Sequence, residues 1–194
     1  MSEFQLYLRL GLDHIADIHS YDHILFIISL CIIYPIKLWN KILFLITAFT
    51  LGHSITLALA TLKIISIPTK LVEFLIPLTI FITAFINLLQ KSDNFKPGTY
   101  KFKYLTALFF GLIHGMGFSN YLRSLLGKGD SLVIPLLSFN IGIELGQIII
   151  VLIIITLSIL IIDLMKVKRR EWVLVLSGAA MGVASILMID RFPW

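Results

Sequence analysis

The 194-residue sequence is poor in the residues that a water-soluble domain places on its surface. Charged residues make up 14% of it and hydrophobic residues 58%, whereas soluble domains contain about 25% charged residues. Its one cysteine, Cys31, lies within an apolar stretch, which excludes a disulfide framework and a thiolate metal cluster. This composition predicts a chain that resides in a lipid bilayer.

Other absences narrow the class further. No Lys lies in the interior of a long apolar stretch, so a retinal Schiff base has no attachment site. The formal net charge is +5, but the basic residues are spread between apolar stretches and do not form one basic face, which excludes a nucleic-acid binder. The first residues lack the basic region and the cleavage site of a signal peptide, and we expect them to be retained.

What the sequence does contain is a series of apolar stretches near the length of about 20 residues that crosses a hydrocarbon layer. They predict an all-α, polytopic membrane bundle that forms a single transmembrane domain over residues 1–194. The predicted elements are an amphipathic segment at 4–20 and about six spans, at 20–36, 41–62, 71–90, 104–125, 133–164 and 172–190. The number of membrane helices becomes seven when the amphipathic segment is counted.

The distribution of positive charge predicts the orientation of the chain. The loops after the first, third and fifth spans contain more Lys and Arg than the loops on the other side. Because positively charged loops stay in the cytoplasm, both termini are predicted to lie outside. Trp39, Trp172 and Trp194 fall at predicted interfaces, where indole rings prefer to sit.

Small residues recur at a spacing that suits close helix packing. Glycines four residues apart let two helix backbones approach each other. Three such pairs occur, namely Gly111 and Gly115, Gly142 and Gly146, and Gly178 and Gly182. They are predicted to act in packing, without chemistry of their own.

Four predicted spans each carry one potential metal ligand at a similar depth. His23, His53, His114 and Glu144 lie roughly 15 to 20 Å from a predicted helix end, at a rise of about 1.5 Å per residue. A lone ionisable group at the bilayer centre costs about 2.5 to 3.5 kcal/mol. These groups and Asp22 must therefore pair with one another, with water or with a metal ion. We predict a functional site; the alternative is a hydrogen-bonded network that only holds helices together.

The first predicted span has a ligand spacing of its own. An i, i+3, i+4 pattern, which puts side chains on one helix face, is formed by His19, Asp22 and His23. Imidazole and carboxylate without thiolate suit nickel, cobalt, zinc or iron, and the spacing does not choose among them.

Further polar residues flank this predicted layer. Asn140 and Gln147 share one helix face with the membrane glutamate and would support it. His14, Asp17 and Glu73 would sit nearer the outer surface, as additional ligands or as a vestibule for incoming ions. The other interpretation of His14 and Asp17 is that they are ordinary hydrated residues of an interfacial helix.

Four sequence strings carry a resemblance to a known family: YDHILF at 21–26, GHSITL at 52–57, GLIHGMGF at 111–118 and FNIGIELGQ at 139–147. Together they resemble the HupE/UreJ family of bacterial membrane proteins, which is linked with hydrogenase and urease systems and regarded as a family of nickel or cobalt permeases. The resemblance implies a multi-pass protein of the bacterial cytoplasmic membrane. It also implies that the metal ligands stand at the family's motif positions, here Asp22, His23, His53, His114 and Glu144.

One motif differs from the family's pattern. The family's first histidine is commonly separated from the Asp-His pair by five residues. Here seven residues follow His14 and two follow His19 before that pair. The motif is completed by His14, by His19 or by neither, and the spacing does not choose among these alternatives.

The leading functional prediction is a transporter for a divalent metal ion, with the lipid bilayer and the ion as its partners. Imidazole suits this function because it exchanges a proton for a metal ion near neutral pH. One alternative is an intramembrane zinc hydrolase, similar in residue inventory to the alkaline ceramidase and adiponectin-receptor superfamily. In that case Asp22 and Ser54 would support a zinc-bound water acting on a lipid. The other alternative is a metal-binding accessory protein without turnover, and any of the three is compatible with a homo-oligomer.

Overall fold

The computed structural model describes residues 2–18, 21–90, 97–125 and 132–194. These residues are mostly helical, and no β-strand occurs among them. In chain order the elements are α1 (Glu3–Ala16), α2 (Asp22–Cys31), η1 (Ile36–Leu38), α3 (Trp39–Thr61), α4 (Thr69–Leu89), α5 (Pro97–Gly117), α6 (Ser119–Leu125), α7 (Val133–Ser158), η2 (Ile159–Leu164) and α8 (Arg169–Asp190). The predicted all-α fold is confirmed.

Four helical stretches of the described chain are long and apolar enough to cross a membrane. They are Ile36–Thr61, Thr69–Leu89, Val133–Leu164 and Arg169–Asp190. Each overlaps one of the spans predicted from the sequence. By length and composition, the chain is a membrane protein.

The other two predicted spans take a different form. Residues 20–36 contribute the short apolar helix α2, which ends at Cys31, ahead of the helix-breaking Pro35. The stretch predicted at 104–125 is divided, because α5 ends at Gly117 and α6 begins at Ser119. Glycine is a poor helix former, and the Ser119 hydroxyl donates to the Met116 carbonyl across the break, at 2.9 Å.

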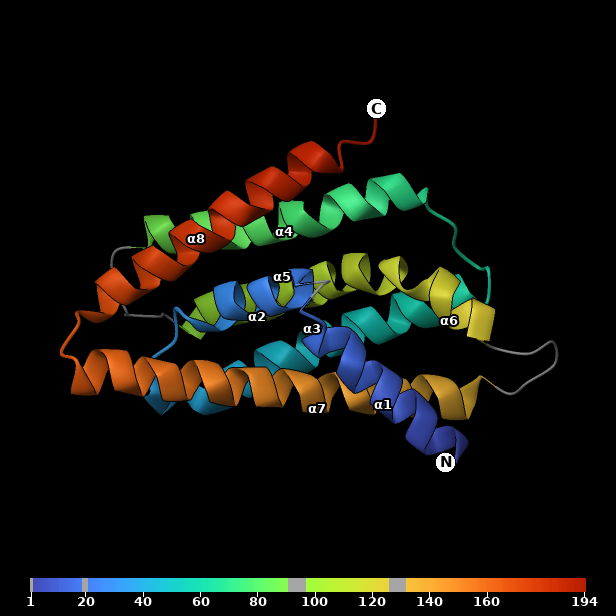
Figure 1. The fold of residues 1–194 in the computed structure, drawn as a ribbon, viewed down its shortest axis with the longest axis horizontal. Helices are drawn as coiled ribbons and strands as arrows, with labels where there is room; N and C mark the ends of the chain where they lie inside the picture. The colour runs from blue at the N-terminus through green and yellow to red at the C-terminus, as the bar shows by residue number, and fades with distance from the viewer. Residues whose placement is uncertain (1, 19–20, 91–96, 126–131) are drawn as a thin grey trace.

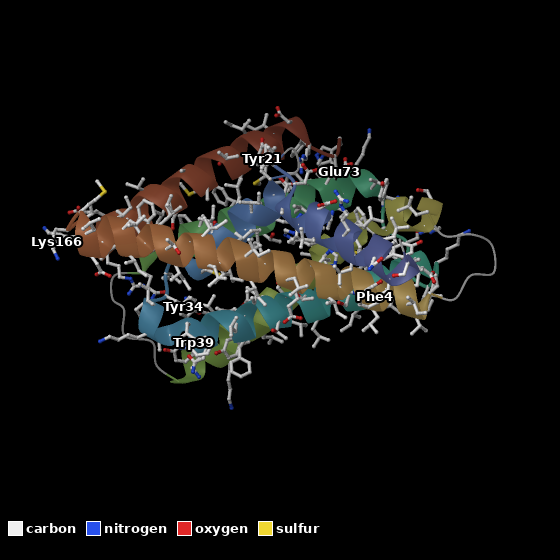
Figure 2. All side chains as sticks on the ribbon, turned by 60° about the horizontal axis from the view of Figure 1, so that its bottom comes forward. Phe4, Tyr21, Tyr34, Trp39, Glu73 and Lys166 are labelled. Atoms are coloured by element: carbon white, nitrogen blue, oxygen red, sulfur yellow. The ribbon has the colours of Figure 1, made fainter. Side chains whose placement is uncertain are left out.

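The helices lie in layers (Figure 1). α4 and α8 run side by side along one side of the bundle, and α7 with α1 along the opposite side. α2, α3 and α5 lie between them, and α3 packs along α5. Figure 2 shows Trp39 and Lys166 toward one end of the bundle and Glu73 toward the other; these are called the Trp39 end and the Glu73 end below.

Glycines set the closest helix contacts. A Cβ on Gly52 of α3 or on Gly111 of α5 would come closer than 3.0 Å to a carbonyl oxygen of the partner helix. The same is true of Gly11 of α1 and Gly142 of α7. Only a residue without a side chain allows two backbones this close. The α1–α7 and α3–α5 pairs are therefore held at backbone contact.

The predicted glycine pairs divide accordingly. Gly115 and Gly146 join Gly111 and Gly142 in these contacts, since a Cβ on either would overlap an atom of the neighbouring helix. Gly178 and Gly182 differ, because a Cβ built on either would meet nothing within 4 Å. The described residues therefore give this last pair no packing role.

Candidate metal centre

Three histidines from three different helices meet inside the bundle. One ligand nitrogen from each of His14 (α1), His23 (α2) and His53 (α3) lies within 4.8 Å of the other two. Their ring centroids are 4.6 Å apart for His14 and His23, 5.9 Å for His14 and His53, and 6.2 Å for His23 and His53. Across residues 2–18, 21–90, 97–125 and 132–194, this is the one such group of three or more potential ligands, and we call it the histidine group.

Most ring nitrogens of the histidine group are buried without a hydrogen-bond partner among the described residues. Both nitrogens of His23 and of His53, and Nε2 of His14, are buried, and no described residue bonds to them. Buried polar atoms are nearly always hydrogen-bonded, because an unpartnered one costs about 1 to 3 kcal/mol. Because a neutral imidazole has one lone pair, a divalent ion would satisfy one nitrogen of each ring and would remove part of that cost. The donor set therefore fits a metal ion chemically.

His114 of α5 stands beside the histidine group, with its ring centroid 5.2 Å from that of His23. Its Nε2 lies 2.9 Å from the Thr79 hydroxyl oxygen. That hydroxyl donates its one proton to the Ile76 carbonyl at 2.7 Å, so it accepts from His114, and Nε2 carries the hydrogen. The lone pair is then on Nδ1, which is buried and has no partner in the described chain. In this tautomer the free lone pair of His114 is buried close to His23, although His114 is not part of the histidine group.

Asp22 faces a different partner. Its Oδ2 accepts a hydrogen bond from Arg191 Nη1 at 2.7 Å, and the side chains are 11% and 29% exposed. Asp22 lines the same cavity as His23, but it is not part of the histidine group. The sequence spacing predicted Asp22 and His23 on one helix face as joint ligands, whereas in the structure the carboxylate contacts Arg191 and the imidazole joins the histidine group.

Glu144 also lies outside the histidine group. Its Oε1 accepts from the Thr47 hydroxyl at 2.7 Å, and Gln147 Oε1 accepts from the Thr50 hydroxyl at 2.8 Å. These two bonds tie α7 to α3. Asn140 donates to the Leu136 carbonyl of its own helix at 2.7 Å. Glu144 and Gln147 therefore serve the α3–α7 contact in this structure, and Asn140 bonds within its own helix.

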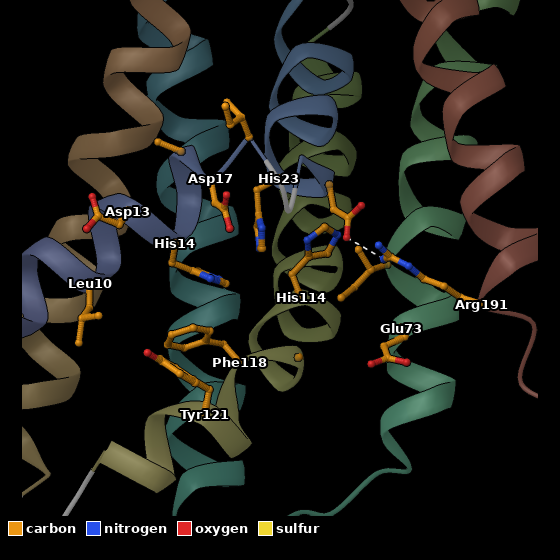
Figure 3. A pocket seen from close by; sticks show the side chains of 15 residues that line it. Leu10, Asp13, His14, Asp17, His23, Glu73, His114, Phe118, Tyr121 and Arg191 are labelled. Atoms are coloured by element: carbon orange, nitrogen blue, oxygen red, sulfur yellow. Dashed lines mark hydrogen bonds and ion pairs between the residues drawn. The ribbon is translucent and has the colours of Figure 1, made fainter.

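A cavity of about 840 Å³ adjoins the histidines and is lined by carboxylates as well as imidazoles (Figure 3). Its imidazoles are His14, His23 and His114, and its carboxylates are Asp13, Asp17, Asp22 and Glu73. Asp17 and Glu73 were predicted to form a vestibule, and they line this cavity.

The remaining residues predicted for the site are His14, Ser54 and His19. The interpretation of His14 as a hydrated interfacial residue is wrong, because its Nε2 is buried and its ring packs on Phe118, with centroids 4.1 Å apart. The face of α1 next to it is buried against α7. Ser54 donates to the Thr50 carbonyl, one turn back on its own helix, at 2.7 Å. His19 lies outside the described residues.

Sequence reasoning missed three residues of this region. Arg191 entered only as a loop charge, although its position directly after the last apolar stretch brings it to the cavity wall. Phe118 ends the GLIHGMGF string, but neither it nor Thr79 was given a role in the site. Thr79 of α4 contacts His114 of α5, and Phe118, between α5 and α6, contacts His14 of α1.

These features define a class, a helical membrane protein with a buried imidazole cluster beside an acidic cavity. A sequence model of the family described as HupE / UreJ protein matches residues 1–191, essentially the whole chain. The chain therefore belongs to the HupE/UreJ family of nickel- or cobalt-transport-related membrane proteins, and the resemblance found in the sequence is confirmed. Neither a curated protein nor a solved structure matches the chain.

Proposed function

We propose that the protein is a permease that carries nickel or cobalt as a divalent ion across the bacterial cytoplasmic membrane. One observation carries the proposal: His14, His23 and His53 present unpartnered nitrogens within 4.8 Å of one another, beside a cavity lined by carboxylates. Nitrogen ligands without thiolate suit these ions. Family membership supports the same substrate class.

The acidic cavity supports capture of the ion. Carboxylates in a cleft with low-dielectric walls raise the local concentration of cations. An ion held by the water shell and these carboxylates would next exchange water for imidazole. The ligands are neutral nitrogens, which bind transition metals without the permanence of a thiolate cage, so the ion can leave again.

His23 supports stepwise movement of the ion. Its ring is shared between the histidine group and His114, whose centroid lies 5.2 Å away. An ion bound by His14, His23 and His53 could exchange ligands for His114 Nδ1 while His23 stays bound. Ligand exchange between overlapping sets avoids a step in which the ion has no protein ligand.

A layer of phenylalanines closes the way beyond the histidines. Phe26, Phe49 and Phe110 each lie about one helical turn from a histidine, on the Trp39 side, and all three are buried. Their ring centroids are 4.8 Å apart for Phe26 and Phe49 and 6.0 Å for Phe26 and Phe110. We call this the phenylalanine layer. It supports a state in which the ion reaches the histidines from the Glu73 end alone.

The proposed topology has six membrane segments and both termini outside. The loops predicted to be cytoplasmic are the basic ones, and the described residues Trp39 and Lys166, next to two of these loops, lie at the Trp39 end. The cavity would then open to the outside, where Arg191 and Glu73 line it, which suits uptake.

No observation favours the zinc hydrolase. The two residues assigned to support hydrolysis have other partners, since Ser54 donates to its own helix and Asp22 accepts from Arg191.

Metal binding by purified protein tests the proposal. Elemental analysis in detergent without chelator, calorimetric titration with Co²⁺ and Ni²⁺, and ion uptake into proteoliposomes would be run on the wild type, on His53→Ala and on Thr156→Ala. Thr156 is exposed and bonds only to the Leu152 carbonyl of its own helix, so it is the matched control. We expect exchangeable binding and uptake in the wild type and the control, and neither in His53→Ala. Intact binding in His53→Ala would overturn the proposed site, and one tightly held zinc per chain would point to the hydrolase.

A further inference from the structure

Arg191 puts a permanent positive charge into a cavity that is otherwise suited to collecting cations. It follows the last residue of α8, and it lines the cavity together with Asp13, Asp17, Asp22 and Glu73. The dashed line in Figure 3 marks its contact with Asp22. A guanidinium stays charged at any pH that the protein meets, and it has no lone pair to offer a metal. The arginine cannot act as a ligand, so its place in the wall needs another explanation.

The contact leaves one oxygen of Asp22 unused. Oδ2 accepts from Arg191 Nη1 at 2.7 Å, whereas Oδ1 is buried and no described residue bonds to it. Asp22 precedes His23, a member of the histidine group. A carboxylate beside the metal site is therefore half engaged, by a cation that belongs to the chain itself.

Two cations cannot both hold this carboxylate at full strength. A divalent ion at Asp22 would gain from the carboxylate charge and lose from repulsion by the guanidinium. A monovalent ion carries no more charge than the guanidinium and would gain little by replacing it. A divalent ion carries twice that charge and can displace it.

We infer that Arg191 competes with the transported ion for Asp22 and thereby sets which ions pass and how tightly they are held. This inference rests on the proposed function. In the empty protein Arg191 neutralises Asp22. An arriving divalent ion displaces the guanidinium, and Arg191 returns to Asp22 as the ion moves on to the histidines, so the ion is not trapped at the carboxylate.

The surroundings allow the side chain to move while the backbone stays. The Arg191 amide donates to the Leu187 carbonyl at 3.0 Å, which continues the α8 backbone pattern. Phe192, the next residue, packs on Phe74 of α4 with ring centroids 5.7 Å apart. The guanidinium therefore can leave Asp22 without detachment of α8 from α4.

A different role makes the opposite prediction. If Arg191 only orients Asp22 as a metal ligand, as partners of ligating carboxylates commonly do, its loss would weaken metal binding by about 10- to 100-fold. If it competes, its loss strengthens binding. The sign of the change in affinity separates the two roles.

The test is calorimetric titration of the full-length protein in detergent with Co²⁺. Arg191→Gln removes the charge, Arg191→Met removes it while keeping an apolar stem, and Arg191→Lys keeps it. Lys168→Gln is the charge-matched control, because Lys168 pairs with Glu171 on an exposed surface at the Trp39 end. A second series carries Asp22→Asn, alone and with Arg191→Gln.

We expect Arg191→Gln and Arg191→Met to bind Co²⁺ about tenfold more tightly than the wild type, with Arg191→Lys and Lys168→Gln unchanged. The gain should disappear when Asp22→Asn is also present. Arg191→Gln and Arg191→Met, which bind Co²⁺ more tightly, should also release it more slowly than the wild type. Unchanged or weaker binding in either neutral variant would overturn the competing role alone, whereas a wild type that binds no divalent ion would overturn the proposed function.

Discussion

Replacing Gly11 by alanine tests whether helix packing positions the metal ligands. The new Cβ would come closer than 3.0 Å to the Phe139 carbonyl oxygen, and it would lie 2.9 Å from the carbonyl carbon and 3.1 Å from Ile143 N. All three are backbone atoms, which cannot rotate away. To reach ordinary contact distances, α1 must move off α7 by about 1 Å.

That displacement reaches His14, one turn further along α1. Metal–ligand distances tolerate changes of about 0.2 Å, so a shift of this size removes His14 from the ligand set. We expect Co²⁺ affinity to fall by about 10- to 100-fold, as it does when ligand orientation is lost. His53 and His114 are on α3 and α5 and should stay in position.

Calorimetric titration with Co²⁺, together with thermal unfolding in the same detergent, measures the effect. Gly178→Ala is the control, because its Cβ would meet nothing within 4 Å, and it should bind Co²⁺ like the wild type. Wild-type affinity in a folded Gly11→Ala variant would refute the link between the α1–α7 contact and the site. Equal losses in both variants would refute it as well.

Three further predictions follow from single contacts. Thr79→Val removes the acceptor that orients His114 and should weaken Co²⁺ binding about tenfold; Thr156→Val, in calorimetric titration, should not. Glu144→Gln should leave Co²⁺ affinity within about twofold of wild type, because this residue bonds to Thr47 and not to the histidines; a larger loss in the same titration would make it a ligand. Phe26→Leu should open the phenylalanine layer and raise Co²⁺ leak from loaded proteoliposomes severalfold, with exposed Phe44→Leu as control; equal leak in both would contradict a closing role.

Depth in the membrane was predictable from the sequence, but direction was not. Counting residues from helix ends puts His53 and His114 at one level, because each residue adds about 1.5 Å, and the structure brings both next to His23. The same count put Glu144 at that level, yet its side chain meets Thr47. The direction in which a side chain points depends on which helices pack against its own helix, and a single sequence does not reveal that packing.

Helix boundaries and contacts between residues far apart in the sequence were harder to predict than depth in the membrane. Apolar length predicted the long helices, but it did not predict that the fourth span would divide between Gly117 and Ser119. The sequence left His14 open between a ligand and a hydrated residue, because α1 has charged residues, but one face of that helix is buried on α7. The partner of Asp22 is 169 residues away in the chain, and no local pattern connects them.

The contacts around the histidines divide the bundle into a fixed part and an adjustable part. His14, His53 and His114 sit on helices held at backbone contact by glycines, and Glu144 fastens the α3–α5 pair to α7 through Thr47. The α4–α8 pair meets the site through side chains, the Thr79 hydroxyl on His114 and the Arg191 guanidinium on Asp22. The backbone contacts at these glycines resist displacement, because two closely packed helix backbones leave no room for adjustment. Side-chain contacts change with a rotamer. The ligands that must keep a metal geometry therefore belong to the fixed part, and the groups that would tune capture and release belong to α4 and α8.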